Sequence, residues 1–241
     1  MKVSLIVPAY NEEQVIERTV CRALSFLAQT FSDYELVVIN DGSTDQTAEI
    51  LSRYQHAIKL VNILKNCGKG NAVRQGILAS DGDVLFFTDA DLSYDLEYIK
   101  KALPLLSKYD IVAGCRTNQR EGYSFFRRLL SKTFAKLAKS VLKCSLTDTQ
   151  CGFKGFRAHA AKSVCALCSL NGFAFDVEML YVAEKYGFSM HAMDVCANRQ
   201  TTKSKVNFIK DPLLMAADIL RVKLNDFGGK YEPVATKTEH F

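Results

Sequence analysis

Residues 84–92 read Val-Leu-Phe-Phe-Thr-Asp-Ala-Asp-Leu, an apolar run that ends in two aspartates two positions apart. The run predicts a buried strand, with Asp89 and Asp91 where that strand reaches the edge of its sheet. Side chains two residues apart point to the same face of a strand, so the two carboxylates can be directed at one point. Such a pair suits Mg²⁺ or Mn²⁺ carrying a diphosphate, because these ions bind one or two carboxylates and complete their coordination with phosphate and water. The alternative is a pair of solvated loop acids.

Three other apolar runs of strand length also lead into polar residues and then into helical patterns. Each run ends in residues suited to binding a ligand: Pro8, Tyr10 and Glu12 after residues 2–7, Asp41 after residues 35–39, and Lys69, within Gly-Lys-Gly, after residues 58–64. Strands that alternate with helices predict right-handed crossovers and a largely parallel sheet, in which ligands bind beyond the carboxyl ends of the strands. We therefore expect these residues to meet Asp89 and Asp91 in one crevice, which favours a binding site over solvated loop acids.

Four stretches of the chain together resemble the inverting glycosyltransferases of family 2. They are Val-Pro-Ala-Tyr-Asn-Glu-Glu at 7–13, Asn-Asp-Gly-Ser-Thr-Asp at 40–45, Gly-Lys-Gly at 68–70 and Asp-Ala-Asp at 89–91. Later, Thr-Asp-Thr-Gln-Cys-Gly-Phe-Lys at 147–154 and Phe-Ala-Phe-Asp-Val-Glu at 173–178 are similar to the polyprenyl-phosphate branch, which includes the dolichyl-phosphate glucosyltransferases and mannosyltransferases. The resemblance covers residues 2–225. It implies a single-domain α/β GT-A fold, the nucleotide-diphospho-sugar transferase fold, with a largely parallel central sheet and flanking helices.

The resemblance implies an enzyme that moves a hexose from a nucleotide-diphospho-sugar to a polyprenyl phosphate, dolichyl or undecaprenyl, with inversion at the anomeric carbon. The donor site it implies consists of Pro8, Tyr10, Glu12, Asp41, Lys69 and Ala90. Within it, Asp41 accepts hydrogen bonds from the base. Mg²⁺ or Mn²⁺ at Asp89 and Asp91 holds the diphosphate and stabilises the negative charge of the leaving group. A non-catalytic nucleotide-binding protein is the alternative, and the intact aspartate pair disfavours it.

A polyprenyl phosphate arrives as an anion, so it needs cations to hold it rather than a base to ionise it. The resemblance places Arg116 and Arg128 with the two aspartates among the catalytic residues. It places Arg128, Arg199 and Lys205 at the acceptor phosphate. Each of these cations has the alternative of an ordinary surface position.

Four polar residues of the later stretches, Asp148, Gln150, Asp176 and Glu178, have two possible roles. They can orient the donor sugar and the cationic cluster, as the polyprenyl-phosphate branch implies, or Asp176 or Glu178 can act as a general base. A base is required when the acceptor is a sugar hydroxyl, as in a family 2 transferase that builds a polysaccharide or O-antigen. We expect the orienting role, and with it a lipid phosphate as acceptor.

The 241 residues contain no Pro/Gly/Ser-rich linker, internal repeat or low-complexity tract, so we expect one catalytic domain at residues 1–225 and a disordered tail at 226–241. No apolar run approaches the roughly 18 to 20 residues of a membrane-spanning helix. Met1 leads directly into the first strand, which leaves no room for a signal peptide. We therefore expect a cytoplasmic protein.

The net charge of +5 comes from one segment. Residues 115–143 contain eight basic residues and one acid, a local +7, so the rest of the chain carries −2. Apolar and basic residues there recur every three or four positions on faces about 200° apart, which predicts a basic amphipathic helix. Such a helix either has a solvated face or lies on an anionic membrane. Because the implied acceptor is a membrane lipid, we expect peripheral contact with the membrane surface; no aromatic-interleaved basic module supports binding to nucleic acid.

Overall fold

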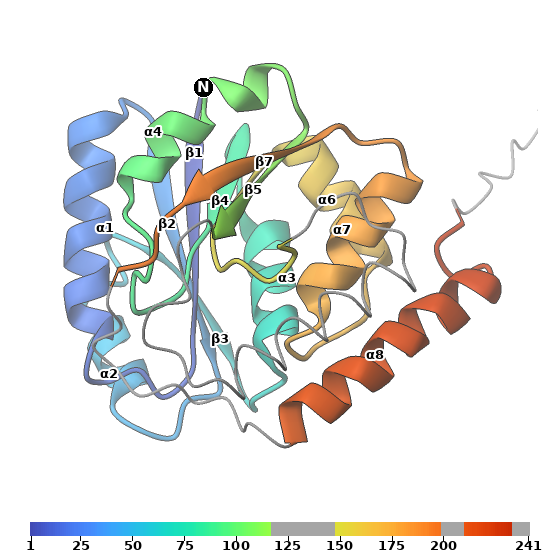
Figure 1. Ribbon diagram of the computed structural model, residues 1–241. Coiled ribbons are helices and arrows are strands. Elements are labelled where there is room, and N and C mark those ends of the chain that lie inside the picture. The colour runs from blue at the N-terminus through green and yellow to red at the C-terminus, as the bar shows by residue number, and fades with distance from the viewer. Residues whose placement is uncertain (117–147, 199–209, 233–241) are drawn as a thin grey trace, which may run out of the picture.

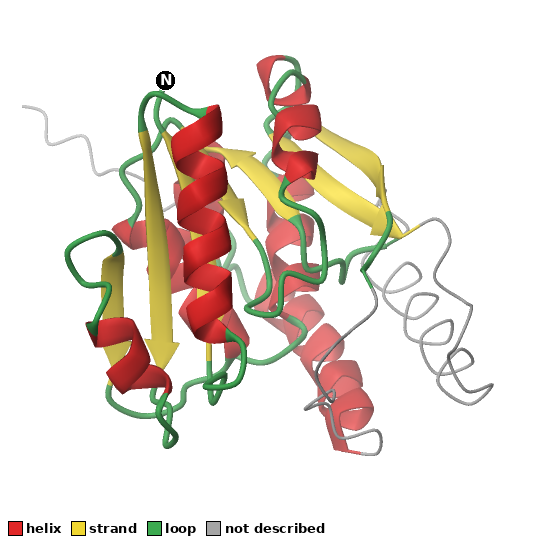
Figure 2. Ribbon diagram, turned by 90° about the vertical axis from the view of Figure 1, so that its left-hand side faces the viewer, coloured by secondary structure: helices red, strands yellow, loops and turns green. Residues whose placement is uncertain are grey.

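A single mixed sheet forms the centre of the computed structural model, which describes residues 1–116, 148–198 and 210–232. Its strands are β1 (Val3–Ala9), β2 (Tyr34–Asp41), β3 (Lys59–Ile63), β4 (Val84–Phe87), β5 (Ile111–Arg116), β6 (Lys154–Arg157) and β7 (Met190–Val195). Their order across the sheet is β3-β2-β1-β4-β6-β5-β7. Figure 2 shows them as one continuous layer with helices in front of it and behind it.

The directions of the strands confirm the predicted, largely parallel sheet. β1 runs parallel to both of its neighbours, β2 and β4, and β3 runs parallel to β2. β6 is antiparallel to β4 and to β5, and β7 is parallel to β5. Within the described ranges β6 alone is reversed, so the carboxyl ends of the other strands share one edge.

The helices connect the strands and cover both faces of the sheet (Figure 1). They are α1 (Ile16–Thr30), α2 (Thr47–Ser52), α3 (Lys69–Ala79), α4 (Glu97–Ala102), the 3-10 turn η1 (Leu105–Ser107), α6 (Ala158–Leu167), α7 (Phe175–Lys185) and α8 (Lys210–Phe227). Neighbouring side chains of a strand point to opposite faces. Leu5 and Val7 of β1 therefore pack with α1, α2 and α4, whereas Ile6 packs with α3, α6 and α7.

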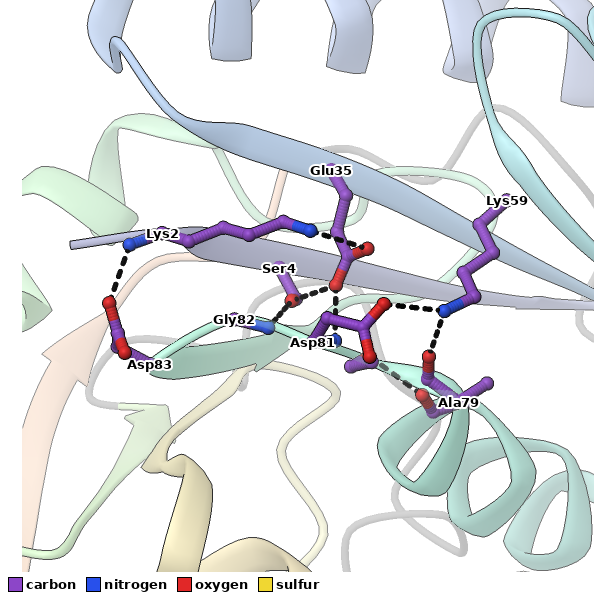
Figure 3. Close-up of polar contacts among 10 residues, drawn as sticks. Lys2, Ser4, Glu35, Lys59, Ala79, Asp81, Gly82 and Asp83 are labelled. Atoms are coloured by element: carbon purple, nitrogen blue, oxygen red, sulfur yellow. Dashed lines mark hydrogen bonds and ion pairs between the residues drawn. The ribbon is translucent and has the colours of Figure 1, made fainter.

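A polar network ties the strands together at the edge of the sheet where β1, β2 and β3 begin (Figure 3). The Glu35 carboxylate accepts hydrogen bonds from the Ser4 hydroxyl at 2.5 Å and the Asp81 N–H at 2.6 Å, and lies 3.2 Å from Lys2 Nζ. Lys59 Nζ bonds to Asp81 at 2.8 Å. These contacts join β1, β2 and β3 to the turn before β4, at the edge opposite to the predicted site.

The packed part of the chain extends past the predicted domain end at residue 225. α8 continues to Phe227, and Tyr231 is fully buried, with its hydroxyl 2.6 Å from Glu178. The prediction of a disordered tail is therefore wrong for residues 226–231, because Tyr231 is part of the core; residues 233–241 lie outside the described ranges. Among the described helices, none has the length and apolar character needed to cross a membrane.

Candidate functional site

The two aspartates lie where the sequence places them, beyond the carboxyl end of β4, but a turn rather than strand alternation positions them. β4 ends at Phe87. The Leu92 N–H donates to the Asp89 carbonyl at 3.0 Å, and Leu92 has φ +48°, a conformation that few residues other than glycine adopt. Asp89 and Asp91 therefore belong to a tight turn, and their carboxylates have different partners.

A cation and a hydroxyl hold these two carboxylates. Lys69, the first residue of α3, lies with its Nζ 2.5 Å from Asp89 Oδ1. The Ser93 hydroxyl lies 2.6 and 2.7 Å from the two oxygens of Asp91, and the Ser93 N–H donates to Oδ1 at 3.0 Å. Burial opposes the charge of Lys69, but the carboxylates of Asp89 and Asp176 outweigh it and raise the pKa of Lys69. Lys69 therefore remains a cation beside Asp89.

Gly152 contacts Asp89 so closely that a side chain fits there only if the Asp89 carboxylate moves. A Cβ atom at this position would lie 2.1 Å from Asp89 Oδ2. Gly152 belongs to residues 148–152, which lead into β6, so this loop lies directly against the aspartate turn. The sequence signal was the Gly in Thr-Asp-Thr-Gln-Cys-Gly-Phe-Lys, and its role depends on a contact between segments far apart in the chain.

Arg116 and Asp148, predicted for different roles, form one pair. Nε and Nη2 of Arg116 lie 2.7 and 2.8 Å from the two Asp148 oxygens, and the Arg116 N–H donates to Asp148 at 3.1 Å. Burial disfavours the charged form of both side chains, but the hydrogen bonds and opposite charge of the partner have a larger effect. The pKa of Arg116 is therefore raised and the pKa of Asp148 is lowered. Gln150, two residues further along, has its Nε2 4.0 Å from Met215 Sδ of α8.

Asp176 is buried against Lys154, a residue that the sequence analysis did not select. Lys154 Nζ lies 2.6 Å from Asp176 Oδ1, 2.7 Å from the Cys151 carbonyl oxygen and 5.2 Å from the centre of the Phe87 ring. Burial raises the pKa of the Asp176 carboxyl, and the charges of Lys154 and Lys69 partly offset this effect. A lysine at the start of an apolar strand was the signal available for Lys154, but the sequence contains no indication of its partner.

Glu178 faces a loop and Tyr231, which follows α8, instead of the aspartates. Its carboxylate accepts the N–H groups of Ser169 at 2.9 Å and Leu170 at 2.7 Å, and the Tyr231 hydroxyl at 2.6 Å. The next residue of this loop, Asn171, accepts the Gly70 N–H at 2.8 Å. Glu178 therefore holds the loop that contacts the first turn of α3, where Lys69 begins the helix.

The predicted nucleoside residues lie at the ends of β1 and β2. Both oxygens of the buried Asp41 accept backbone N–H groups, from Cys67 at 3.0 Å and Gly68 at 2.8 Å. Gly68 has φ +99°, which favours glycine, and it precedes α3. Asp41 thus shapes the Gly-Lys-Gly loop, and its predicted contact with a base remains a prediction.

The other donor residues lie nearby. Pro8 is paired with Ile39 in the sheet, and Tyr10 is 36% exposed beyond the end of β1. The Glu12 N–H donates to the Thr47 hydroxyl at 2.7 Å, which joins the loop after β1 to the loop after β2. Ala90 is buried, and its carbonyl accepts the Thr19 hydroxyl of α1 at 2.5 Å.

Three predicted acceptor cations, Arg128, Arg199 and Lys205, lie outside the described residues. Most of the basic segment, residues 117–147, lies outside them as well. In the described part, no group of three or more His, Cys, Asp or Glu side chains is arranged to hold a metal ion. Two carboxylates suffice for Mg²⁺ or Mn²⁺ when phosphate oxygens and water complete the coordination. Asp89 and Asp91 match that donor set.

An α/β sheet with paired aspartates beyond a central strand and a Gly-Lys-Gly loop beside them defines a nucleotide-sugar transferase of the GT-A type. The chain belongs to glycosyl transferase family 2, whose family model matches residues 4–165. It is 31% identical to the dolichyl-phosphate beta-glucosyltransferase of Homo sapiens over 98% of this chain and 79% of that protein. It is also 31% identical to the enzyme of the same name from Dictyostelium discoideum, over 91% of this chain and 73% of that protein.

Solved structures share the fold. The glucosyl-3-phosphoglycerate synthase of Mycobacterium tuberculosis, in complex with Mn²⁺, UDP-glucose and phosphoglyceric acid, matches with a TM-score of 0.67 and 20% identity. The match covers 94% of this chain and 80% of that one. This likeness confirms the GT-A prediction for the fold.

Proposed function

We propose that the protein transfers a hexose from a nucleotide-diphospho-sugar to a polyprenyl phosphate and inverts the anomeric carbon. Its similarity to dolichyl-phosphate beta-glucosyltransferases over nearly the whole chain supports a lipid phosphate as acceptor. Because such an acceptor is a membrane lipid, the protein works at a membrane surface. UDP-glucose is the first donor to test, since the glucosyl-3-phosphoglycerate synthase of similar fold was solved in complex with it.

The observation that carries this proposal is the state of the carboxylates predicted to orient substrates or act as a base. Asp148 is paired with Arg116, and Asp176 is paired with Lys154. Glu178 accepts two backbone N–H groups and the Tyr231 hydroxyl. A sugar hydroxyl requires a carboxylate that is available to take its proton, whereas a phosphate arrives ionised. Carboxylates already committed to such partners favour the phosphate.

Asp89 and Asp91 would hold the Mg²⁺ or Mn²⁺ that the donor set fits. A bound divalent ion supplies positive charge to the leaving diphosphate. The protein contributes Lys69, a cation at the start of α3, and Ser93, which holds Asp91 in place. Arg116, whose Nε and Nη2 bind Asp148, is the described cation that we assign to the acceptor side.

Replacing Asp91 tests the metal assignment. Asp91→Ala should fold normally and lose about two to three orders of magnitude in turnover, because leaving-group stabilisation is removed. Asp95→Ala, which changes an exposed acid four residues away, is the control and should retain turnover. Titration of Mn²⁺ in the presence of UDP should show weaker Mn²⁺ binding in Asp91→Ala and wild-type binding in Asp95→Ala. Unchanged Mn²⁺ affinity in Asp91→Ala would end the metal assignment.

The acceptor is tested with a short-chain polyprenyl phosphate and its dephosphorylated alcohol, using labelled UDP-glucose and other nucleotide sugars. We expect transfer to the phosphate and none to the alcohol. Asp176→Asn and Glu178→Gln should retain measurable transfer. Arg128→Ala and Arg199→Ala should no longer use the acceptor, because each removes charge-assisted hydrogen bonds worth roughly 1.5 to 3 kcal/mol each. Glycosylation of the alcohol as well as the phosphate would indicate that the acceptor group is a hydroxyl.

A further inference from the structure

α8 is apolar on both of its sides. Toward the core it buries Ile219 and Val222. The exposed positions among its described side chains are Leu214, Ala217, Leu220, Arg221, Leu224 and Phe227. Leu224 is 71% exposed and Phe227 is 95% exposed. A helix at the surface of a water-soluble domain normally presents polar residues outward, so this outer face is built for a different neighbour.

The charges of α8 indicate what that neighbour is. Arg221 is the only charged residue among the exposed positions of the described part of α8. Two acids of the described part of α8 have contacts away from this face: Asp226 accepts hydrogen bonds from Lys185 and Tyr181, and Asp218 is partly buried. An outer face that has large apolar side chains and a cation but no acid at its described positions, 214–227, is complementary to an anionic lipid surface.

α8 also lies next to the candidate site. Met215, on its inner side, contacts Gln150, and Asp218 lies 3.6 Å from where a Cβ of Gly172 would be. Gly172 follows Asn171, which contacts the first turn of α3. Figure 1 shows α8 along the outside of the molecule, on the side opposite α1. Its 18 residues extend over roughly 27 Å, so a surface that covered it would lie next to a helix that contacts the loops of Gln150 and Gly172.

We propose that α8 is a membrane-docking helix that lies in the surface of an anionic bilayer, with Leu220, Leu224 and Phe227 inserted among the lipids and Arg221 against their phosphates. This inference rests on the proposed function for the lipid nature of the acceptor. It assigns docking to a different segment from the basic residues 115–143. The consequence is that the lipid acceptor reaches the site from the side of Gln150.

The chain contains no tryptophan, so a single introduced tryptophan reports on its own surroundings. Leu224→Trp should show a blue shift of its fluorescence when vesicles of phosphatidylcholine and phosphatidylglycerol are added, and a smaller shift with phosphatidylcholine alone. Leu78→Trp is the matched control, because Leu78 is an exposed leucine near the end of α3, nine residues beyond Lys69. Equal shifts in both variants, or none in Leu224→Trp, would overturn the proposal.

A second variant removes the apolar face. The double change Leu220→Ser and Leu224→Ser should lower partitioning into the mixed vesicles by at least about tenfold, since several buried methylene groups are lost. Helicity by circular dichroism and transfer to a water-soluble short-chain acceptor should not change, because both leucines are exposed. Transfer to a long-chain acceptor in vesicles should fall with the partitioning.

The outcomes separate this inference from the proposed function. Vesicle binding that depends on α8, without transfer to any polyprenyl phosphate, would reject the function and retain the docking helix. Transfer with vesicle binding unaffected by the double change would reject the docking helix and retain the function. If the double change instead converted a dimer into a monomer in sedimentation experiments, without affecting vesicle binding, the face would be an interface between two copies of the chain.

Discussion

At the scale of single residues, the site depends on a glycine, which has no side chain, as much as on the charged groups. Gly152 lies where any Cβ would contact Asp89 Oδ2 at 2.1 Å, a distance at which the carboxylate must move. Lys69 and Ser93 hold the two aspartates from the other sides. The positions of both carboxylates are therefore determined by neighbours from three separate segments of the chain.

Gly152→Ala should displace Asp89 without unfolding the protein, because the clash is with a side chain. We expect turnover to fall about a hundredfold, the order of effect seen when a reacting group is misplaced by about 1 Å. The thermal midpoint and the turnover are the two measurements. Gly172→Ala is the matched control, since the nearest atom to its Cβ lies at 3.6 Å. Full turnover in Gly152→Ala would mean that Asp89 is not needed in its present position.

The buried pair of Lys154 and Asp176 should matter for stability as well as for the site. Lys154→Met leaves the Asp176 carboxylate buried without its cation, which costs about 3 to 5 kcal/mol of unfolding free energy. Adding Asp176→Leu removes that charge, so the double variant should be more stable than Lys154→Met alone. Urea denaturation measures both. The control Lys100→Met, which breaks an exposed ion pair with Glu97, should cost less than about 1 kcal/mol of unfolding free energy. A double variant that is no more stable than Lys154→Met would contradict the charge explanation.

At the scale of elements, the segment after α8 is linked to the first turn of α3. The Tyr231 hydroxyl donates to Glu178, Glu178 accepts the N–H groups of Ser169 and Leu170, and the adjacent Asn171 accepts the Gly70 N–H. Lys69 precedes Gly70 and contacts Asp89. A residue that follows α8 thus helps to position the cation of the candidate site.

Tyr231→Phe tests this connection because it deletes one hydroxyl from a buried, hydrogen-bonded position. We expect a loss of roughly 1.5 to 3 kcal/mol in unfolding free energy, as for a hydrogen bond to a charged group, together with lower turnover. Tyr186→Phe deletes a hydroxyl that donates to the Tyr231 carbonyl at 3.0 Å and does not touch Glu178. It should reduce stability and leave turnover unchanged. Equal turnover in the two variants would show that Tyr231 is only structural.

At the scale of the whole molecule, the sheet separates two polar edges with different tasks. The carboxyl edge carries the candidate site, and the opposite edge carries the network around Glu35 (Figure 3). Burial raises the pKa of Glu35, but the Ser4 hydroxyl, the Asp81 N–H and Lys2 outweigh it, so the pKa is lowered from its ordinary value of 4.5. The Glu35 carboxylate is therefore favoured in the folded state.

This lowered pKa predicts a pH-dependent contribution to stability. A group with a depressed native pKa stabilises the fold above its ordinary pKa, and the stabilisation is lost as the pH falls through the native value. The difference in unfolding free energy between the wild type and Glu35→Gln should therefore be largest near neutral pH and shrink below about pH 4.5. Urea denaturation over a pH series measures it. Glu97→Gln, which breaks an exposed ion pair with Lys100, is the control and should change the unfolding free energy by less than about 1 kcal/mol.

The local sequence determined the strands and helices of the first half of the chain. Apolar runs of strand length followed by helical stripes led to the right elements, including β1, β2, β4 and α3, because binary patterning within one element depends only on neighbouring residues. The alternation of strands with helices led to the parallel sheet, and the carboxyl ends of β1, β2 and β4 accordingly share one edge. Asp41, Lys69 and Asp89 were identifiable for that reason.

Only the tertiary structure decided which of these groups are partners. Strand alternation does not explain the aspartate pair, since β4 ends before Asp89 and a turn with Leu92 at positive φ places the acids. Arg116 with Asp148 and Lys154 with Asp176 are separated by 32 and 22 residues. The end of the domain was misplaced because a single tyrosine after Gly-Gly has no periodic pattern, although Tyr231 is fully buried. Such contacts between distant segments are selected by packing of the whole sheet and its helices, and no window of neighbouring residues contains that information.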